Sequence, residues 1–94
     1  MIETLIKRIR YGYFSREKQR VFLEDLSTLV ADGIPVSRAI DTIRQVSEGI
    51  TQQVAAHISR GIAQGKQLAD GMQGWFFRPT IEIIRAGEIS GTLV

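Results

Sequence analysis

The chain has 94 residues, of which 44% are hydrophobic and 23% are charged, a composition typical of one small globular domain. It contains no cysteine, which excludes disulfide bridges, thiolate metal sites and cysteine nucleophiles. No run of 18 apolar residues occurs, and Lys7, Arg8 and Arg10 interrupt the N-terminal apolar stretch, so neither a membrane span nor a signal peptide is predicted. We therefore expect this part of the protein in the cytoplasm.

The net charge of +2 is unevenly distributed along the chain. Residues 1–20 contain six basic and two acidic residues, a balance of +4, whereas the other 74 residues contain six basic and eight acidic residues, a balance of −2. We expect residues 1–14 to form a basic amphipathic arm whose apolar stripe consists of Ile2, Leu5, Ile6 and Ile9.

Lys7, Arg8 and Arg10 flank this stripe, an arrangement suited to an anionic membrane surface, to nucleic acid or to an acidic protein surface. Two simpler interpretations remain open. The arm can be a solvated helical face, or its stripe can pack back on the rest of the domain.

Helical spacing of apolar residues continues through the rest of the chain. A helix is predicted over 16–32, capped by Ser15 at its start and ended by Gly33, a residue suited to a left-handed C-cap. Pro35 then starts a second helix, over 35–47. The apolar stripe predicted for this second helix consists of Val36, Ala39, Ile40, Ile43 and Val46.

Thr51 is the predicted cap of the next helix, in which apolar residues recur every four positions at Val54, Ile58 and Ile62. A short helical turn is expected over 68–72, and Pro79 opens a helix that ends near Gly87. These segments predict an all-α fold, a compact antiparallel bundle of about six short helices over residues 15–94. We expect its core to contain Phe22, Leu26, Leu29, Ile40, Ile43, Ile58 and Ile84.

Residues 87–93 combine two glycines, a carboxylate and a cap residue. Gly87 can end one helix and Ser90 can cap the next, which places Glu88 near the unpaired N–H groups of that next helix. A tight corner between helices explains this pattern better than a direct contact with a partner. Because the chain stops just after Ser90 begins a helix, we expect a fragment of a longer protein.

The sequence shows no pattern typical of an active site or a cofactor site. His57 is the only histidine, and a zinc site needs three or four ligands. No phosphate-binding glycine motif occurs, and the acidic residues are scattered. We therefore predict no catalytic residue, no metal and no cofactor. A helical DNA-binding module that uses the basic arm is an alternative, although the best helix-turn-helix candidate, 16–47, has a second helix of mixed charge.

Several motifs occur in an order and spacing that resemble a known family. Phe22, Leu26 and Leu29 run into an Asp-Gly-Ile-Pro turn that contains Gly33 and Pro35, and residues 65–72 form a glycine-bounded Leu-Ala turn. An aromatic–proline step at 75–79 follows, with Arg78 inserted before Pro79. The last motif, Gly-Glu-x-Ser-Gly-x-Leu, consists of Gly87, Glu88, Ser90, Gly91 and Leu93. Residues 16–94 thereby resemble the F-type platform domain of bacterial type II secretion and type IV pilus systems, with Gly71 where alanine is usual.

The resemblance implies an inner-membrane protein whose helical domains lie in the cytoplasm, of which this chain is similar to the first. It implies a scaffold without catalytic activity that couples an ATPase to the assembly of pilin or pseudopilin subunits. The implied partners are that cytoplasmic assembly ATPase, other inner-membrane assembly proteins, pilin or pseudopilin, and a second copy of the protein. Nucleic acid is not among them. A carboxylate such as Glu88 could join a calcium site at a contact between subunits.

Overall fold

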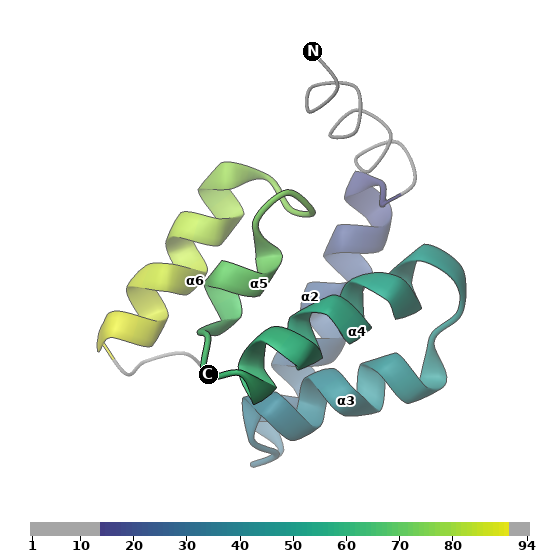
Figure 1. The fold of residues 1–94 in the computed structure, drawn as a ribbon, viewed down its shortest axis with the longest axis horizontal. Coiled ribbons are helices and arrows are strands. Elements are labelled where there is room, and N and C mark those ends of the chain that lie inside the picture. The colour runs from purple at the N-terminus through teal and green to yellow at the C-terminus, as the bar shows by residue number, and fades with distance from the viewer. Residues whose placement is uncertain (1–13, 91–94) are drawn as a thin grey trace.

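The computed structural model describes residues 14–90, and every regular element in this range is a helix (Figure 1). The helices are α2 (Arg16–Ala31), α3 (Val36–Val46), α4 (Gly49–Ala63), α5 (Leu68–Met72) and α6 (Arg78–Ser90). Helices that are consecutive in the chain pack on one another, from α2 on α3 to α5 on α6. The all-helical class predicted from the sequence is confirmed, with five helices in the described residues.

Helix α2 begins and ends where its capping residues predict. The Ser15 hydroxyl accepts a hydrogen bond from the Lys18 amide at 3.3 Å, which satisfies one of the unpaired N–H groups of the first turn. Gly33 has a φ of +90°, in the left-handed region that favours glycine. The Gly33 amide donates to the Val30 carbonyl and the Ile34 amide to the Leu29 carbonyl, the two bonds of a Schellman motif.

The connection between α3 and α4 differs from the prediction. Helix α4 begins at Gly49, with Glu48 at the N-cap position, so the cap predicted at Thr51 was wrong by three residues. Gly49 has a φ of +62°, which lets the chain turn sharply from α3 into α4. Val46, predicted to be buried, is 76% exposed, because it is the last residue of α3 and no following turn of the helix covers it.

Three aromatic rings form the centre of the core. Phe14, Phe22 and Phe76 are each 0–1% exposed, and their rings meet edge to face with centroids 5.1–6.1 Å apart. Five of the seven predicted core residues are buried: Phe22, Leu26, Ile40, Ile43 and Ile58. The other two, Leu29 and Ile84, are half-buried and pack against the edge of the core.

The backbones of α4 and α5 approach each other closely. A second Schellman motif ends α4, with the Gly65 amide bonded to the Ile62 carbonyl and the Lys66 amide to the Gly61 carbonyl. It turns the chain back so that Gly71 of α5 meets Ile58 of α4. A Cβ atom added at Gly71 would lie 3.1 Å from the Ile58 Cα atom, so the two backbones would have to shift by a few tenths of an ångström to accept a side chain at position 71.

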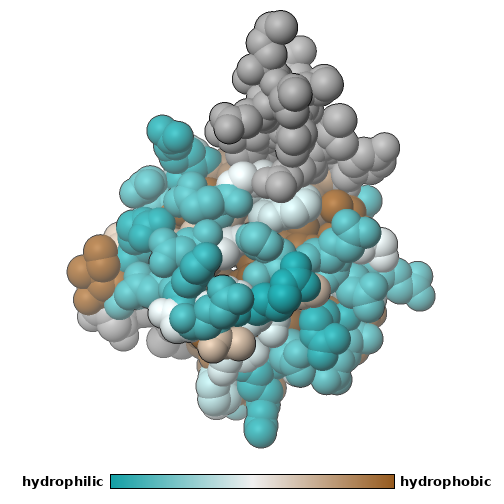
Figure 2. Space-filling view, viewed as in Figure 1, coloured by the Kyte–Doolittle hydropathy of each residue, from teal (hydrophilic) through white to brown (hydrophobic). Residues whose placement is uncertain are grey.

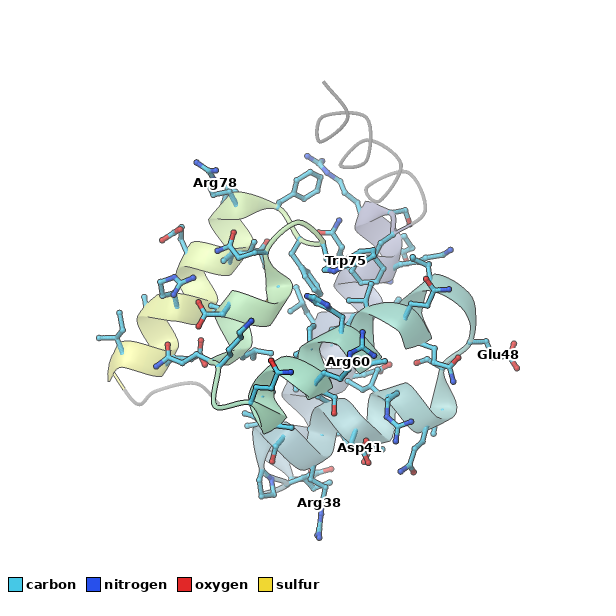
Figure 3. All side chains as sticks on the ribbon, viewed as in Figure 1. Arg38, Asp41, Glu48, Arg60, Trp75 and Arg78 are labelled. Carbon is cyan, nitrogen blue, oxygen red and sulfur yellow. The ribbon has the colours of Figure 1, made fainter. Side chains whose placement is uncertain are left out.

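The surface is largely polar on the face shown in Figure 2. Exposed apolar atoms at the left edge of that view lie over the C-terminal end of α6. Ile83 and Ile89 of this helix are 72% and 77% exposed. Charged side chains project outward in Figure 3: Arg38 near the start of α3, Glu48 just before α4 and Arg78 at the start of α6. Within residues 14–90, no helix combines the length and apolarity needed to cross a membrane.

Candidate functional site: the corner between α5 and α6

The described part of the motif at the C-terminal end of the chain does not form the turn that was predicted at Gly87. Helix α6 continues through Gly87 and Glu88 to Ser90. Gly87 is therefore a helical residue, and among the described glycines the positive φ values belong to Gly33, Gly49, Gly65 and Gly74. The expectation that Gly87 ends a helix was wrong. The helix that Ser90 was predicted to cap would lie outside the described residues. Gly91 and Leu93 lie outside the described residues.

Glu88 does meet unpaired backbone N–H groups, but those of a helix 20 residues earlier. Its Oε2 atom accepts a hydrogen bond from the Leu68 amide at 2.8 Å, and its Oε1 atom accepts one from the Ala69 amide at 2.9 Å. These amides belong to the first two residues of α5, where intrahelical acceptors are lacking and the helix dipole favours negative charge. The half-buried Glu88 carboxylate is thus an N-terminal cap supplied from α6.

Residues of α5 itself satisfy the rest of this helix start. The Gln67 side chain accepts from the backbone of Asp70, and the Asp70 carboxylate accepts from the Gln67 amide at 3.3 Å, which together make a capping box. The other Asp70 oxygen binds the Arg85 guanidinium at 3.2 Å. Arg85 lies one turn before Glu88, so two successive turns of α6 hold the N-terminal end of α5.

A buried glutamine joins the other end of α6 to the rest of the domain. Gln19 of α2 is 4% exposed, and its Nε2 atom donates to the Phe14 carbonyl at 3.1 Å. Its Oε1 atom accepts from the Phe77 amide at 3.3 Å. The Arg16 guanidinium lies 4.6 Å from the centroid of the Phe77 ring, a cation–π contact. The role of Gln19 was not predicted from the sequence, because a polar residue in a helix looks solvent-exposed unless its distant partner is known.

Exposed charges on α2 form a network of ion pairs. Arg20 binds Glu17 and, at 2.7 Å, Glu24. Its hydrogen bond and its positive charge hold the pKa of the Glu17 carboxyl below the ordinary value of 4.5. The same pairing raises the pKa of Arg20, which stays charged at any physiological pH. All three side chains are exposed, so this network contributes little to folding.

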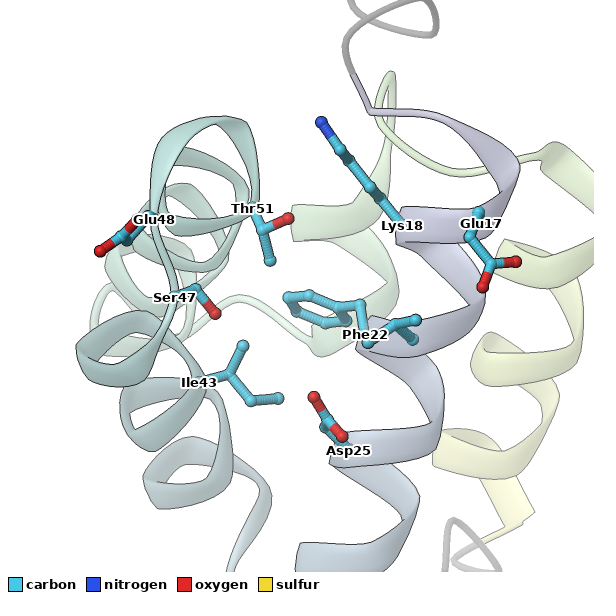
Figure 4. A pocket seen from close by; sticks show the side chains of 9 residues that line it. Glu17, Lys18, Phe22, Asp25, Ile43, Ser47, Glu48 and Thr51 are labelled. Atoms are coloured by element: carbon cyan, nitrogen blue, oxygen red, sulfur yellow. The ribbon is translucent and has the colours of Figure 1, made fainter.

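Two shallow pockets flank α2. One of about 270 Å³ lies between α2 and the α3–α4 turn, over Phe22 and Ile43, with Ser47 and Thr51 pointing inward (Figure 4). The other, of about 360 Å³, lies between α2 and the start of α6 over Leu23 and Phe77. Both are near or below the lower limit of small-molecule sites, roughly 300 Å³.

Some residues considered in the sequence analysis take no part in these contacts. His57 is exposed, and its ring centroid lies 6.2 Å from that of Trp75. Within residues 14–90, no three His, Asp or Glu side chains gather closely enough to hold a metal ion. Lys7, Arg8 and Arg10, predicted to contact a membrane or a partner, lie outside the described residues.

The chain matches a known protein family. Residues 22–94 match the family model described as type II secretion system (T2SS), protein F. The chain is also 33% identical over 76 residues to the type 4 fimbrial assembly protein PilC of Pseudomonas putida. That match covers 77% of this chain and 19% of the relative, so the chain spans about a fifth of the curated protein's length. No solved structure matches the chain significantly. The chain belongs to the protein F family of the type II secretion system.

Proposed function

We propose that this chain is a scaffold domain without catalytic activity, within a platform protein of the bacterial inner membrane. In this proposal the domain lies in the cytoplasm and couples an assembly ATPase to the addition of pilin or pseudopilin subunits. The observation that carries the proposal is the family match over residues 22–94, which includes the motif from Gly87 to Leu93. The 33% identity to a type 4 fimbrial assembly protein supports the same kind of machine.

The geometry of the α5–α6 corner supports a structural use of its carboxylates. Both carboxylate oxygens of Glu88 accept hydrogen bonds from backbone N–H groups. One carboxylate oxygen of Asp70 belongs to the capping box, and the other binds Arg85. A general acid or base must be free to exchange a proton with a substrate. Carboxylates that are bound to the backbone in this way serve to hold two helices together.

A scaffold acts through its surface, and the partners we propose follow from the family. They are the cytoplasmic assembly ATPase, other inner-membrane assembly proteins, pilin or pseudopilin, and a second copy of the platform protein. The DNA-binding alternative gains no support from α3, the recognition helix of the predicted helix-turn-helix. Arg44 on α3 is paired with Asp41 at 2.8 Å, which reduces its availability to phosphate groups.

Removal of residues 15–94 from the gene in its own bacterium tests the proposal. We expect surface pili, or secretion of the exported substrate, to be lost while pilin or pseudopilin is still made at normal levels by immunoblot. A direct binding measurement with the 94-residue chain should detect the assembly ATPase of the same bacterium and not an ATPase from an unrelated pilus system. Normal piliation and secretion after the deletion would refute the proposal.

A further inference from the structure

Helix α6 is held to the domain by few apolar contacts. Among the fourteen buried apolar residues of the described chain, only Ile81 comes from α6, supported by the half-buried Ile84. The remaining core residues come from Phe14, from α2 to α5 and from Phe76. Much of α6 faces solvent, including Arg78, Pro79, Glu82, Ile83, Ala86 and Ile89. An element with little buried apolar area separates from a domain more easily than the elements that form its core.

The start of α6 is the firmly anchored end. Phe76, two residues before the helix, is fully buried between Phe14 and Phe22. The next residue, Phe77, donates its amide to the buried Gln19. Gly74, with a φ of +81°, provides the turn that leads from α5 to this anchor. Residues 76–77 therefore form a fixed point from which α6 extends.

The far end of α6 is held by polar contacts. Glu88 lies ten residues beyond Arg78, which places it about 15 Å along the helix from the anchor. There it caps α5 through the Leu68 and Ala69 amides, while Arg85 binds Asp70. The Arg85 and Asp70 side chains are 32% and 42% exposed, so water can replace their contact when it breaks. Hydrogen bonds at such a site can open without exposing the aromatic core.

We propose that α6 is a lever that pivots at Phe76–Phe77 and is clasped in its closed position by Glu88. In the open position α6 separates from α5, the Leu68 and Ala69 amides become exposed to water, and α2 to α5 remain folded. Glu88 is thereby a positioning residue, which holds the C-terminal part of α6 against the N-terminal end of α5.

Distance measurements between two spin labels test the lever directly. The chain has no cysteine, so Val46→Cys and Ile83→Cys, at exposed sites on α3 and α6, accept one label each. We expect a narrow distance distribution in the parent chain and a broadened or shifted one in Glu88→Ala. Glu82→Ala is the matched control, because it removes an exposed carboxylate from the same helix and leaves the clasp intact.

Hydrogen exchange supplies a second measurement in the same variants. In Glu88→Ala the Leu68 and Ala69 amides should exchange faster by about 10- to 100-fold, the effect of losing bonds to a charged acceptor. The Ile40 and Ile58 amides, in the core helices α3 and α4, should keep their protection. Glu88→Gln should be intermediate, because an amide side chain has one acceptor oxygen in place of two.

Two results would overturn the lever. An unchanged distance distribution in Glu88→Ala would show that apolar contacts alone fix α6. A loss of protection at Ile40 and Ile58 together with Leu68 would show that α6 unfolds only with the whole domain. The clasp requires normal protection of the Ile40 and Ile58 amides, together with a changed distance between the two spin labels.

Discussion

Gln19 and Glu88 each satisfy at least one backbone group that lies far from them in the sequence. Gln19 binds the Phe14 carbonyl and the Phe77 amide, and Glu88 binds the Leu68 and Ala69 amides. Buried backbone groups without a partner are costly, so such side chains make particular arrangements of segments favourable. Their positions explain why single polar residues can determine how α6 is held at both ends.

Substitution of the single residue Leu26 tests whether its side chain belongs to the core. It is 5% exposed, and its replacement in Leu26→Ala leaves a cavity among the packed helices. We expect a loss of about 2–5 kcal/mol in the free energy of unfolding, measured by chemical denaturation. Val46→Ala is the control, since Val46 is 76% exposed and should change stability by less than about 0.5 kcal/mol. Equal effects of the two substitutions would mean that Leu26 is not in the core.

Gly71 and Gly61 should respond in opposite directions to the same change. Gly71→Ala places a Cβ atom 3.1 Å from the Ile58 Cα atom, so α4 and α5 must move apart, at a cost of about 1–3 kcal/mol. A Cβ atom at Gly61 would lie 3.7 Å from the Lys66 side chain, an ordinary contact. Gly61→Ala should therefore stabilise the domain by up to about 1 kcal/mol, because alanine favours helix. Thermal denaturation of both variants checks the sign, and stabilisation by both would contradict the close approach.

At the scale of elements, α2 and α5 depend on different parts of the molecule. Helix α2 has 16 residues, a serine cap at its start and a Schellman motif at its end. Helix α5 has five residues, far fewer than an isolated helix needs in water. It persists through contacts outside itself, chiefly the burial of Leu68, Ala69 and Met72 in the core, to which the Glu88 cap is added.

The Ser15 cap can be tested with a matched serine on the same helix. Ser15→Ala removes the acceptor of the Lys18 amide and should cost about 1 kcal/mol of stability. Ser27 is exposed in the interior of α2, where alanine is the better helix former, so Ser27→Ala should be neutral or slightly stabilising. Urea denaturation of the two variants measures the difference. If Ser15→Ala were as stable as Ser27→Ala, the cap would contribute nothing.

At the scale of the whole molecule, each described helix packs on the next one in the chain, and α6 packs on α5 at the end of this series. Helices α2 to α5 supply most of the core, and α6 contributes one buried side chain, that of Ile81. Cooperative unfolding should therefore be dominated by α2 to α5. The exposed Ile83 and Ile89 on α6 remain outside that core.

Metal removal should leave the stability of the whole domain unchanged. Residues 14–90 contain no cluster of three side chains able to hold a metal ion, and the Glu88 oxygens already accept backbone hydrogen bonds. We expect thermal melts with EDTA, and with added calcium, to superimpose on the melt in plain buffer. A higher melting temperature in calcium would contradict this and would implicate a carboxylate such as Glu88 in a cation site.

The sequence by itself determined the helical class, the start of α2 at Ser15, the turn at Gly33 and most of the core. These features depend on neighbours within a few residues, through helical spacing and capping. Only the tertiary structure decided the role of Glu88. Its local pattern predicted a cap for a following helix, whereas its acceptors meet the N-terminal end of α5, 20 residues earlier. The continuation of α6 through Gly87 and the burial of Gln19 were decided in the same way, because packing between distant segments outweighs local preference.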